Sequence, residues 1–175
     1  MDEDIERKAA RVSAVIMDVD GVLTDGKSYC QPDGSHTVAF DVQDGSGIKY
    51  LGRAGLRTAF ITGRTVRAVK HRAETLDVDR LAQGAKRKVP VYRDLRDELG
   101  CDDEEVCYVG DDLPDLPVLR EVGFAVAVKN ARPQVRDEAD MVTEAAGGAG
   151  AIRELAEFIL RARGDWDGIM ERYRA

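Results

Sequence analysis

Two aspartates stand one residue apart at the end of an apolar run. Residues 15 to 17 read Val-Ile-Met, and Asp18, Val19, Asp20 and Gly21 follow directly. Side chains at positions i and i+2 of a strand share a face, so both carboxylates could address one small hard cation. A strand followed by an acidic turn is the simpler alternative, and this segment alone does not decide between the two.

A second apolar run ends in the same way in the other half of the chain. Residues 106 to 109 lead into Gly110, and Asp111, Asp112 and Asp115 follow. Mg²⁺ prefers oxygen ligands and is usually held by one or two carboxylates together with substrate phosphate. The repeated pattern therefore favours a site for Mg²⁺ over two unrelated acidic turns.

A third apolar run ends in groups that suit an anion. Thr62, Gly63 and Arg64 follow residues 58 to 61, and Lys88 opens a later helical segment. The hydroxyl of Thr62, the unobstructed N–H of Gly63 and the charge of Lys88 can together bind phosphoryl oxygens. Each signal is weak alone, because a Thr-Gly pair is usually a turn and a single lysine is usually solvated. Because these groups occur together with the two carboxylate clusters, they indicate a site that binds and cleaves a phosphate ester.

The apolar runs also predict the sheet that would position these groups. Five segments are short and apolar on both faces, which is typical of parallel strands. They are residues 14 to 17, 58 to 61, 106 to 109, 124 to 128 and 141 to 143. Helical periodicity between them predicts right-handed βαβ units, whose strands end at a common ligand crevice. The expected fold class is α/β, a Rossmann-like parallel sheet flanked by helices.

Residues 26 to 42 interrupt this alternation. Residues 32 to 34 read Pro-Asp-Gly, a turn sequence, and Val38, Phe40 and Val42 lie on one face of the segment that follows. We predict a projecting β-hairpin. A two-stranded hairpin with an apolar face is marginally stable alone in water, so a partner subunit is the first candidate to cover it. Packing against the chain's own core is the alternative.

The strongest helical pattern lies near the C-terminus. Apolar residues recur at helical spacing between Gly150 and Arg163, and Gly164 is placed to end the helix. Asp165 is a plausible N-cap for a second short amphipathic segment that begins at Trp166. We expect this segment to be a packing element.

The polar clusters and Lys88 resemble the four motifs of the haloacid dehalogenase superfamily of phosphatases. The motifs are Asp-Val-Asp-Gly-Val-Leu-Thr from Asp18, Ile-Thr-Gly-Arg from Ile61, Lys88, and Gly-Asp-Asp-Leu-Pro-Asp from Gly110. The match covers nearly the whole chain. It is most similar to the capless 3-deoxy-D-manno-octulosonate 8-phosphate phosphatases, with further signatures at residues 40 to 48, 84 to 88 and 147 to 154.

The resemblance implies a catalytic role for each motif residue. Asp18 attacks phosphorus to form an aspartyl-phosphate, a covalent intermediate that water then hydrolyses. Asp20 protonates the leaving sugar oxygen and later takes a proton from the attacking water. Thr62, Gly63 and Lys88 bind the transferring oxygens.

The resemblance also implies a ligand set for Mg²⁺. Asp18, Asp111 and the backbone carbonyl of Asp20 bind the ion. Asp112 and Asp115 hold its waters or steady the phosphate-binding lysine, and the sequence leaves their assignment open.

The substrate implied by the resemblance is a phosphorylated sugar acid. Its carboxylate favours a guanidinium partner, for which Arg64 and Arg72 are candidates. The sister branch, which acts on nonulosonate or N-acylneuraminate 9-phosphates, tends to have Glu in place of Arg64 and Lys in place of Thr75. Residues 43 to 45 read Gln-Asp-Gly where the octulosonate family usually shows Arg-Asp-Gly. A nine-carbon sugar acid therefore stays open as the alternative substrate.

The length and charge of the chain indicate how many domains it has and which partners it lacks. At 175 residues the chain predicts one domain, 1 to 175, with the hairpin insertion at about 26 to 42. The net charge of −7, with basic residues interspersed among acidic ones, argues against a nucleic-acid surface. The charged N-terminus and the lack of an apolar run of ~20 residues predict a cytoplasmic protein with no membrane contact.

The cysteines and histidines carry no motif in the sequence. Cys30, Cys101 and Cys107 have neither close paired spacing nor a histidine nearby in a known pattern, so we expect reduced thiols and no zinc site. His36 and His71 are expected at the surface. In the resembling family the hairpins assemble a homotetramer and help to cover neighbouring active sites, in place of a cap domain.

Two other classes of function compete with a phosphatase. A catalytically silent domain that oligomerises through the hairpin is one, but it has no use for a cluster of carboxylates that repel one another. A phosphomutase or another phosphoryl transferase is the other. A capless site is open to water, which favours hydrolysis.

Overall fold

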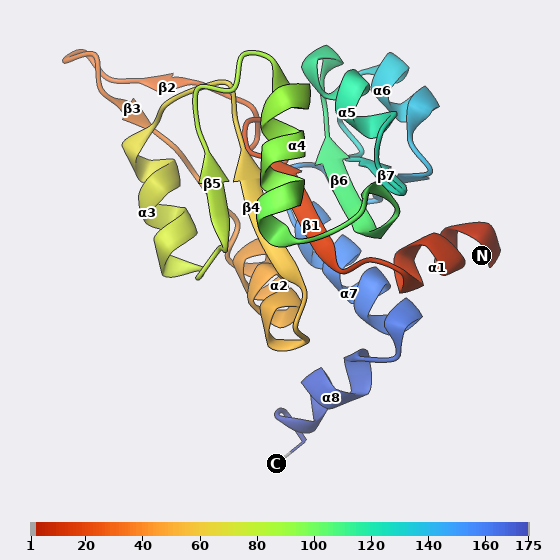
Figure 1. Cartoon of the computed structure of the whole chain (residues 1–175). Helices are drawn as coiled ribbons and strands as arrows, with labels where there is room; N and C mark the ends of the chain where they lie inside the picture. Colours follow the sequence, from red (N-terminus) through yellow and green to blue (C-terminus); the bar gives the residue numbers. More distant parts are fainter. Residues whose placement is uncertain (1–2, 175) are drawn as a thin grey trace.

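The six strands of the central sheet all run parallel in the order β5-β4-β1-β6-β7-β8 (Figure 1). This is a computed structural model, and it describes residues 3 to 174. Five strands lie where the apolar runs predict them, which confirms the expected α/β fold class. They are β1 (Ala14–Asp18), β4 (Arg57–Ile61), β6 (Val106–Gly110), β7 (Phe124–Ala127) and β8 (Met141–Val142).

The sixth strand, β5 (Arg80–Ala82), was not predicted. It pairs with β4 at the edge of the sheet, and Arg80 is exposed. A strand of three residues with a charged member does not form an apolar run, so the sequence pattern carries no signal for it.

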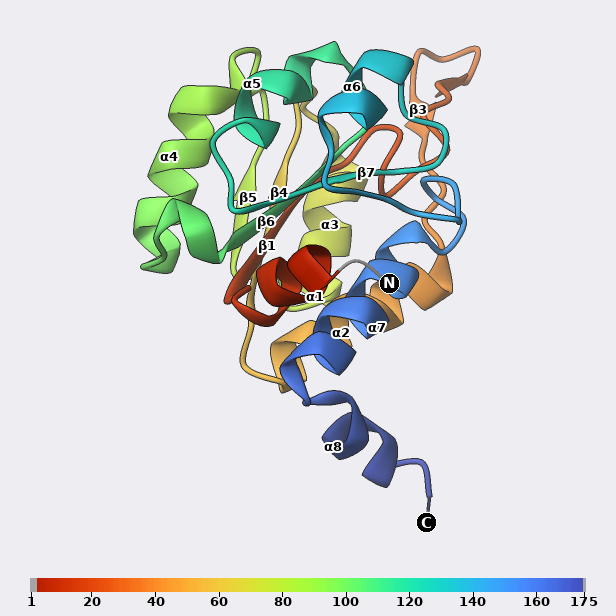
Figure 2. The same ribbon diagram turned by 90° about the vertical axis from the view of Figure 1, so that its right-hand side faces the viewer.

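Helices cover both faces of the sheet (Figure 2). One layer contains α1 (Glu3–Ala10), α2 (Val42–Arg53) and α7 (Ala151–Arg163), and the other contains α4 (Lys88–Leu99) and α5 (Leu116–Leu119). The remaining helical segments are α3 (Arg67–Thr75), α6 (Pro133–Glu138), α8 (Trp166–Glu171) and the 3₁₀ turns η1 (Asp103–Glu105) and η2 (Leu113–Asp115).

Strand register brings the three polar clusters together. Every residue of β1 is buried, and β1 lies between β4 and β6. Met17 pairs with Phe60 on one side and with Val109 on the other. The residues just beyond these pairs are therefore neighbours at the carboxyl edge of the sheet, which is where open α/β sheets bind ligands.

The C-terminal helices confirm the predicted pattern. α7 spans Ala151–Arg163, and Gly150 and Gly164 flank it with φ angles of 98° and 80°. α8 begins after Asp165, although this side chain makes no capping hydrogen bond and accepts one from Arg163 instead. Trp166 and Tyr173 pack edge-on against Tyr50 of α2, so this segment is a packing element, as expected.

Asp44 of α2 forms hydrogen bonds with the N-terminus of α7. Its buried carboxylate accepts hydrogen bonds from the backbone N–H of Arg153 at 2.9 Å and of Gly150 at 3.3 Å. Gly47 lies one turn further along, where an added Cβ would come within 2.9 Å of Arg153 Cα. The signatures around residues 40 to 48 and 147 to 154 therefore meet in one helix contact.

We expect Asp44→Ala to lower the free energy of unfolding by about 1 kcal/mol, because it removes the acceptor for two N–H groups at a helix N-terminus. Urea unfolding followed by far-UV circular dichroism measures the change. Asp137→Asn, on the exposed side of α6, is the control and should change little. An unchanged urea-unfolding midpoint for Asp44→Ala would show that water serves equally well as the acceptor for the N–H groups of Gly150 and Arg153.

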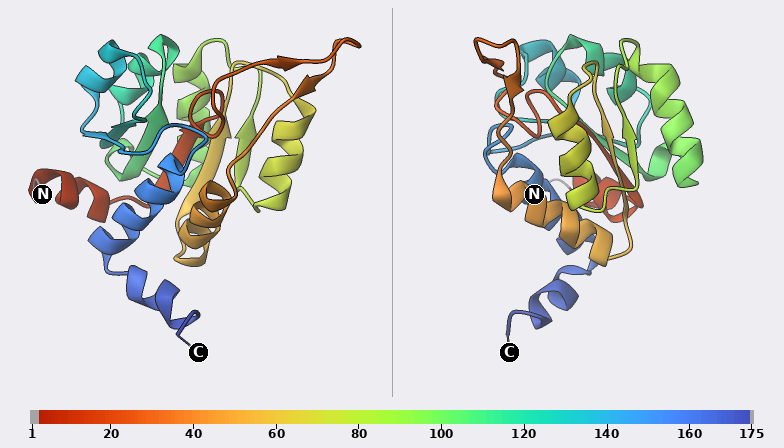
Figure 3. Two further views of the ribbon diagram at one scale, coloured as in Figure 1. Left: turned by 180° about the vertical axis from the view of Figure 1, so that it is seen from behind. Right: turned by 90° about the vertical axis from the view of Figure 1, so that its left-hand side faces the viewer.

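The predicted hairpin is present and projects away from the sheet (Figure 3). Its strands are β2 (Tyr29–Cys30) and β3 (His36–Thr37), both exposed. The predicted second strand is too long, because Val42 is the first residue of α2. Asp41 ends the hairpin by accepting hydrogen bonds from the N–H groups of residues 43 and 44 at 2.6 and 3.0 Å.

The base of the hairpin packs against the rest of the chain. Phe40 is partly buried against the core, and the guanidinium of Arg72 lies 5.5 Å from the centre of its ring. The apolar face expected on the hairpin is therefore only partly covered by the chain itself. Phe40 packs against the chain's own core, whereas the strands β2 and β3 remain exposed.

Candidate active site

A cavity of about 370 Å³ opens at the carboxyl edge of the sheet. Eight of the ten predicted site residues line it, so the strand ends do bring the separate motifs together. The eight are Asp18, Asp20, Gly63, Arg64, Lys88, Asp111, Asp112 and Asp115. Gly26, Ala85, Lys86 and Pro114 complete the lining.

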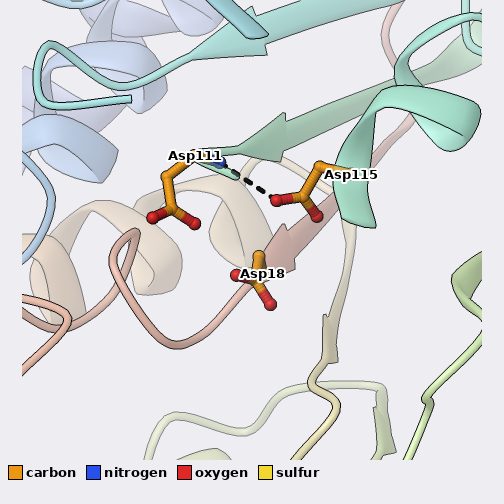
Figure 4. A group of neighbouring side chains, drawn as sticks. All are labelled: Asp18, Asp111 and Asp115. Carbon is orange, nitrogen blue, oxygen red and sulfur yellow. Dashed lines mark hydrogen bonds between the residues drawn. The ribbon is translucent and has the colours of Figure 1, made fainter. Parts of the chain in front are cut away.

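Three carboxylates that line the cavity lie next to one another, two from strand ends and one from a 3₁₀ turn (Figure 4). Asp18 ends β1, Asp111 follows β6, and Asp115 lies at the end of the 3₁₀ turn η2. One oxygen from each lies within 4.8 Å of the others. Such a group of oxygen ligands suits a small divalent cation.

Asp115 is already occupied by hydrogen bonds. Its Oδ1 accepts from Lys88 Nζ and from the hydroxyl of Tyr108, both at 2.6 Å. Its Oδ2 accepts from the backbone N–H groups of Asp111 and Asp112, both at 3.1 Å. The structure therefore favours a supporting role for Asp115 and leaves Asp18 and Asp111 as the carboxylates that face a cation.

Asp111 has the environment of a metal ligand. Its Oδ1 is buried and has no hydrogen-bond partner among residues 3 to 174. Burial, together with the neighbouring charge of Asp115, raises the pKa of Asp111 to about 6. A buried carboxylate oxygen without a donor is unfavourable, and a bound cation would satisfy it. The donor set fits Mg²⁺.

Lys88 bridges two of the three carboxylates. Its Nζ lies 2.7 Å from Asp18 Oδ1 and 2.6 Å from Asp115 Oδ1, and the side chain is buried. Burial favours the neutral amine, but the two carboxylates outweigh it and raise the pKa of Lys88, so the ammonium stays charged. Lys88 is the first residue of α4, as predicted.

Tyr108 and Lys86 belong to the site as well, although neither was predicted from the sequence. Tyr108 is fully buried in β6 and donates its hydroxyl hydrogen bond to Asp115. A tyrosine within a buried strand usually has a polar partner, which is the signal that could have identified it. Lys86 is exposed at the rim of the cavity and has no distinguishing sequence signal beside Lys88.

The cavity carries an excess of negative charge. Five aspartates and three basic residues line it, which leaves two negative charges unbalanced. An anionic phosphate would be repelled from such a surface. One divalent cation would balance the excess and allow the phosphate to approach.

Asp20 is held by two groups from the loop after β4. Thr62 Oγ1 donates to Asp20 Oδ2 at 2.8 Å, and Arg64 Nη1 donates to Asp20 Oδ1 at 2.9 Å. Thr62 is fully buried and does not line the cavity. Its single hydroxyl proton is used by Asp20, so in this structure Thr62 orients that carboxylate instead of facing a phosphate.

Arg72 is the second predicted site residue outside the cavity. It donates to the backbone carbonyl of Asp41 at 2.9 Å and lies over the ring of Phe40. This geometry supports a structural role at the base of the hairpin. It does not support the predicted contact between Arg72 and a substrate carboxylate within one copy of the chain.

Gly21 explains the close approach of the first and fourth motifs. Its φ angle is 98°, and an added Cβ would lie 2.1 Å from Asp111 Oδ2. Thr24 closes the turn, since its hydroxyl accepts from the N–H groups of Gly21 and Gly26, both at 3.2 Å. On the far side, a Cβ on Gly147 would meet the carbonyl oxygen of Gly21 at 1.7 Å.

We expect Mg²⁺ to bind more weakly in acid, because a proton competes with the ion for Asp111. With a pKa of about 6 this carboxyl is mostly ionised at pH 7.5 and mostly protonated at pH 5. Isothermal titration calorimetry should therefore show affinity lower by about tenfold at pH 5. In Asp111→Asn the remaining weak binding should depend less on pH, and the dependence that is left should come from Asp18, whose pKa burial also raises. Equal affinity of the native chain at both values would contradict the assignment.

Comparison with known proteins agrees with the geometry. A model of the haloacid dehalogenase-like hydrolase family matches residues 81 to 155. The 3-deoxy-D-manno-octulosonate 8-phosphate phosphatase KdsC of Escherichia coli strain K12 is 43% identical over 164 residues, which cover 94% of this chain and 87% of that protein. The chain belongs to the 3-deoxy-D-manno-octulosonate 8-phosphate phosphatase family. This bears out the resemblance seen in the motifs.

Solved structures of family members have the same fold. The crystal structure of the Moraxella catarrhalis phosphatase, in complex with magnesium ion, phosphate ion and a KDO molecule, gives a TM-score of 0.96 at 38% identity and covers 99% of both chains. The Yersinia pestis phosphatase gives 0.93 at 41% identity and covers 95% of this chain and 90% of that one. No helix among residues 3 to 174 is long and apolar enough to span a membrane.

Proposed function

We propose that this chain is a Mg²⁺-dependent phosphatase that hydrolyses 3-deoxy-D-manno-octulosonate 8-phosphate to the free sugar acid, KDO, and inorganic phosphate. The observation that carries the proposal is the junction of Asp18, Asp111 and Lys88 at one edge of the sheet. Family membership over 94% of the chain supports the choice of substrate. The whole chain, 1 to 175, acts as one domain.

Asp18 is the proposed nucleophile. Lys88 contacts its Oδ1, which fixes the carboxylate at the end of β1 and leaves the second oxygen to attack phosphorus. The attack forms an aspartyl-phosphate and releases the sugar alkoxide, and water then hydrolyses the aspartyl-phosphate. Burial and Asp115 raise the pKa of Asp18, while Lys88 opposes them and favours the ionised form that can attack.

Asp20 is the proposed general acid and base. It lies two residues after the nucleophile, so it can reach the leaving oxygen of an ester that Asp18 attacks in line. Thr62 and Arg64 hold its two oxygens and fix its orientation. In the first step Asp20 donates a proton to the sugar oxygen, and in the second it takes one from water.

Asp18, Asp111 and the backbone carbonyl of Asp20 would hold Mg²⁺. When bound, the ion neutralises charge on the phosphoryl oxygens. Gly63, an exposed residue, would offer its backbone N–H to the same oxygens, and the buried Lys88 would contribute its ammonium. Asp112, whose carboxylate accepts from the N–H of Leu113 at 2.8 Å, shapes the rim.

Arg64 and Lys86 are the more exposed of the three basic residues that line the cavity. Arg64 uses one guanidinium nitrogen for Asp20, and a guanidinium has five N–H donors, so others remain for a substrate carboxylate. Gln43, which replaces the arginine usual in the family, is exposed near the start of α2. The alternative substrate is therefore a nonulosonate or N-acylneuraminate 9-phosphate, in which the sugar acid has nine carbons.

A phosphate-release screen tests the proposal. It compares octulosonate 8-phosphate, nonulosonate 9-phosphates, nucleotides and hexose phosphates, each with Mg²⁺ and after removal of the metal by EDTA. We expect the highest kcat/KM for octulosonate 8-phosphate, loss of activity with EDTA and recovery on addition of Mg²⁺. A preference of about 100-fold for a nucleotide would overturn the substrate, and activity that survives EDTA would overturn the metal.

We also propose that the chain assembles as a homotetramer through the hairpin in the cytoplasm. The exposed strands β2 and β3, with Tyr29 at 42% exposure, support a partner surface on the hairpin. A silent interaction domain would use the same hairpin but would release no phosphate. Light scattering coupled to gel filtration measures the assembly, and a monomer at micromolar concentration would contradict it.

A further inference from the structure

A fully buried tyrosine, Tyr108 of β6, lies beside the carboxylates of the cavity without lining it. Its hydroxyl donates to Asp115 Oδ1 at 2.6 Å, and the same oxygen accepts from Lys88 Nζ, also at 2.6 Å. Lys88 Nζ in turn lies 2.7 Å from Oδ1 of Asp18. An unbroken series of contacts therefore joins the tyrosine hydroxyl to the proposed nucleophile.

The hydrogen bonds of Asp115 fix the orientation of its carboxylate. Its Oδ2 accepts from the backbone N–H groups of Asp111 and Asp112, both at 3.1 Å. Its Oδ1 accepts from Tyr108, whose ring is anchored within a buried strand, and from Lys88, which reaches it on a flexible four-carbon stem. The tyrosine hydroxyl therefore fixes where Oδ1 lies, and Oδ1 fixes where the ammonium lies.

The hydroxyl of Tyr108 is a donor that substrate cannot reach. Burial and the charges of Asp115 and Asp18 raise the pKa of Tyr108 well above that of tyrosine in water, so the hydroxyl keeps its proton. The residue is 0% exposed and is not part of the cavity lining. Any effect of this hydroxyl on the reaction must therefore pass through Asp115 and Lys88.

We propose that Tyr108 is a positioning residue for the reaction at Asp18: its hydroxyl fixes Asp115, and Asp115 holds the Lys88 ammonium against the nucleophile. The role rests on the proposed function, because it presupposes that Asp18 attacks a phosphate ester. Without the hydroxyl, Asp115 Oδ1 loses the donor that fixes it, and the ammonium that it holds shifts away from Asp18. The chemical step then suffers more than binding of the ester, since Tyr108 touches no part of the substrate.

Tyr108→Phe tests the role, because it removes one oxygen atom and keeps the buried ring. We expect kcat for phosphate release from octulosonate 8-phosphate to fall by about tenfold while KM changes by less than about twofold. Mg²⁺ affinity, measured by isothermal titration calorimetry, should also stay within about twofold, since Asp18 and Asp111 keep their places. An unchanged kcat, or a fall that tracks tenfold weaker binding of Mg²⁺, would overturn the proposal.

Tyr92 of α4 provides a matched control. It is also fully buried, and its hydroxyl donates at 2.6 Å to Asp103 Oδ1, which accepts from Arg96 Nη1 at 2.8 Å as well. This arrangement copies that of Tyr108 but lies away from the cavity lining. Tyr92→Phe should therefore lower the urea-unfolding midpoint and keep kcat within about twofold of the native value. Equal losses of kcat in both tyrosine variants would reveal a general effect of stability and refute the positioning role.

A double-mutant cycle with Lys88→Ala shows whether the effect passes through the lysine. If it does, Tyr108→Phe should lower kcat by less than about twofold once the ammonium is absent. A tenfold loss in both backgrounds would mean that Tyr108 acts by another route, contrary to the proposal. Lys88→Met, which keeps the aliphatic stem, takes the place of Lys88→Ala if circular dichroism shows that the alanine variant is unfolded.

The native chain separates failure of this role from failure of the proposed function. If the native chain releases phosphate and Tyr108→Phe matches it, the function stands and the role of Tyr108 falls. If the native chain releases no phosphate from any ester, the function and the role fall together.

Discussion

Asp18→Asn is expected to lower kcat by about 10⁴-fold or more, because the amide cannot attack phosphorus and no other described carboxylate occupies the end of β1. Asparagine has nearly the same shape as aspartate, so the loss reports chemistry and not packing. Phosphate release from octulosonate 8-phosphate at saturating Mg²⁺ measures it. Residual activity within tenfold of the native chain would show that Asp18 is not the nucleophile.

Stability measurements separate this effect from misfolding. Burial and the charge of Asp115 raise the pKa of Asp18, so its ionised form is a net cost to the metal-free fold near neutral pH. Removing that charge should therefore not lower the unfolding midpoint in EDTA. Asp137→Asn, on the exposed face of α6, is the matched control and should keep full activity.

Lys88→Ala is expected to lower both activity and stability. The ammonium contacts Asp18 and Asp115 at 2.7 and 2.6 Å with 6% of the side chain exposed. Losing a preorganised charge next to the phosphate should lower kcat/KM by about 10² to 10³-fold. Leaving two buried carboxylates without their cation should lower the free energy of unfolding by about 3 kcal/mol.

Lys86→Ala is the matched control for this lysine. Lys86 lines the same cavity but is exposed and makes no buried ion pair in the described chain. Its loss should change stability by less than about 0.5 kcal/mol. Urea unfolding in EDTA and steady-state kinetics measure both variants. If Lys88→Ala is as stable as Lys86→Ala, the buried bridge does not hold the carboxylate cluster together.

The sequence was sufficient to predict the meeting of Asp18 and Asp111. Both follow apolar strands, and parallel strands that alternate with helices end at one edge of a sheet. No contact had to be known for that inference. Helical periodicity and a helix-ending glycine correctly predicted that Lys88 opens a helix, α4, and that Gly164 ends another, α7.

The roles of individual side chains required three-dimensional partners. That Asp115 is occupied depends on the hydroxyl of Tyr108 and on Lys88, which lies 27 residues away. That Thr62 faces Asp20 depends on the turn after β4. Sequence spacing does not specify which oxygen a hydroxyl or ammonium will contact. It therefore left open whether Asp115 steadies Lys88 or holds metal-bound water, and it gave no sign that Thr62 faces Asp20.

The hairpin is a second place where the sequence pattern did not predict the structure. The alternation of Val38, Phe40 and Val42 is typical of a strand, but Asp41 is also a good helix N-cap and its hydrogen bonds begin α2 at Val42. Local capping prevailed over the period-two pattern. The pairing of Cys30 with His36 was equally hidden, since a cross-strand contact depends on the register that the turn sets.

A crystal structure of the chain grown with Mn²⁺ in place of Mg²⁺, in which anomalous scattering locates the ion, tests most directly whether Asp18 and Asp111 share one cation. We expect one ion in the cavity, bound by a carboxylate oxygen of Asp18 and by one of Asp111, with Asp115 still hydrogen-bonded to Lys88. An ion bound by only one of these two aspartates, or one that displaces Lys88 from Asp115, would contradict this expectation.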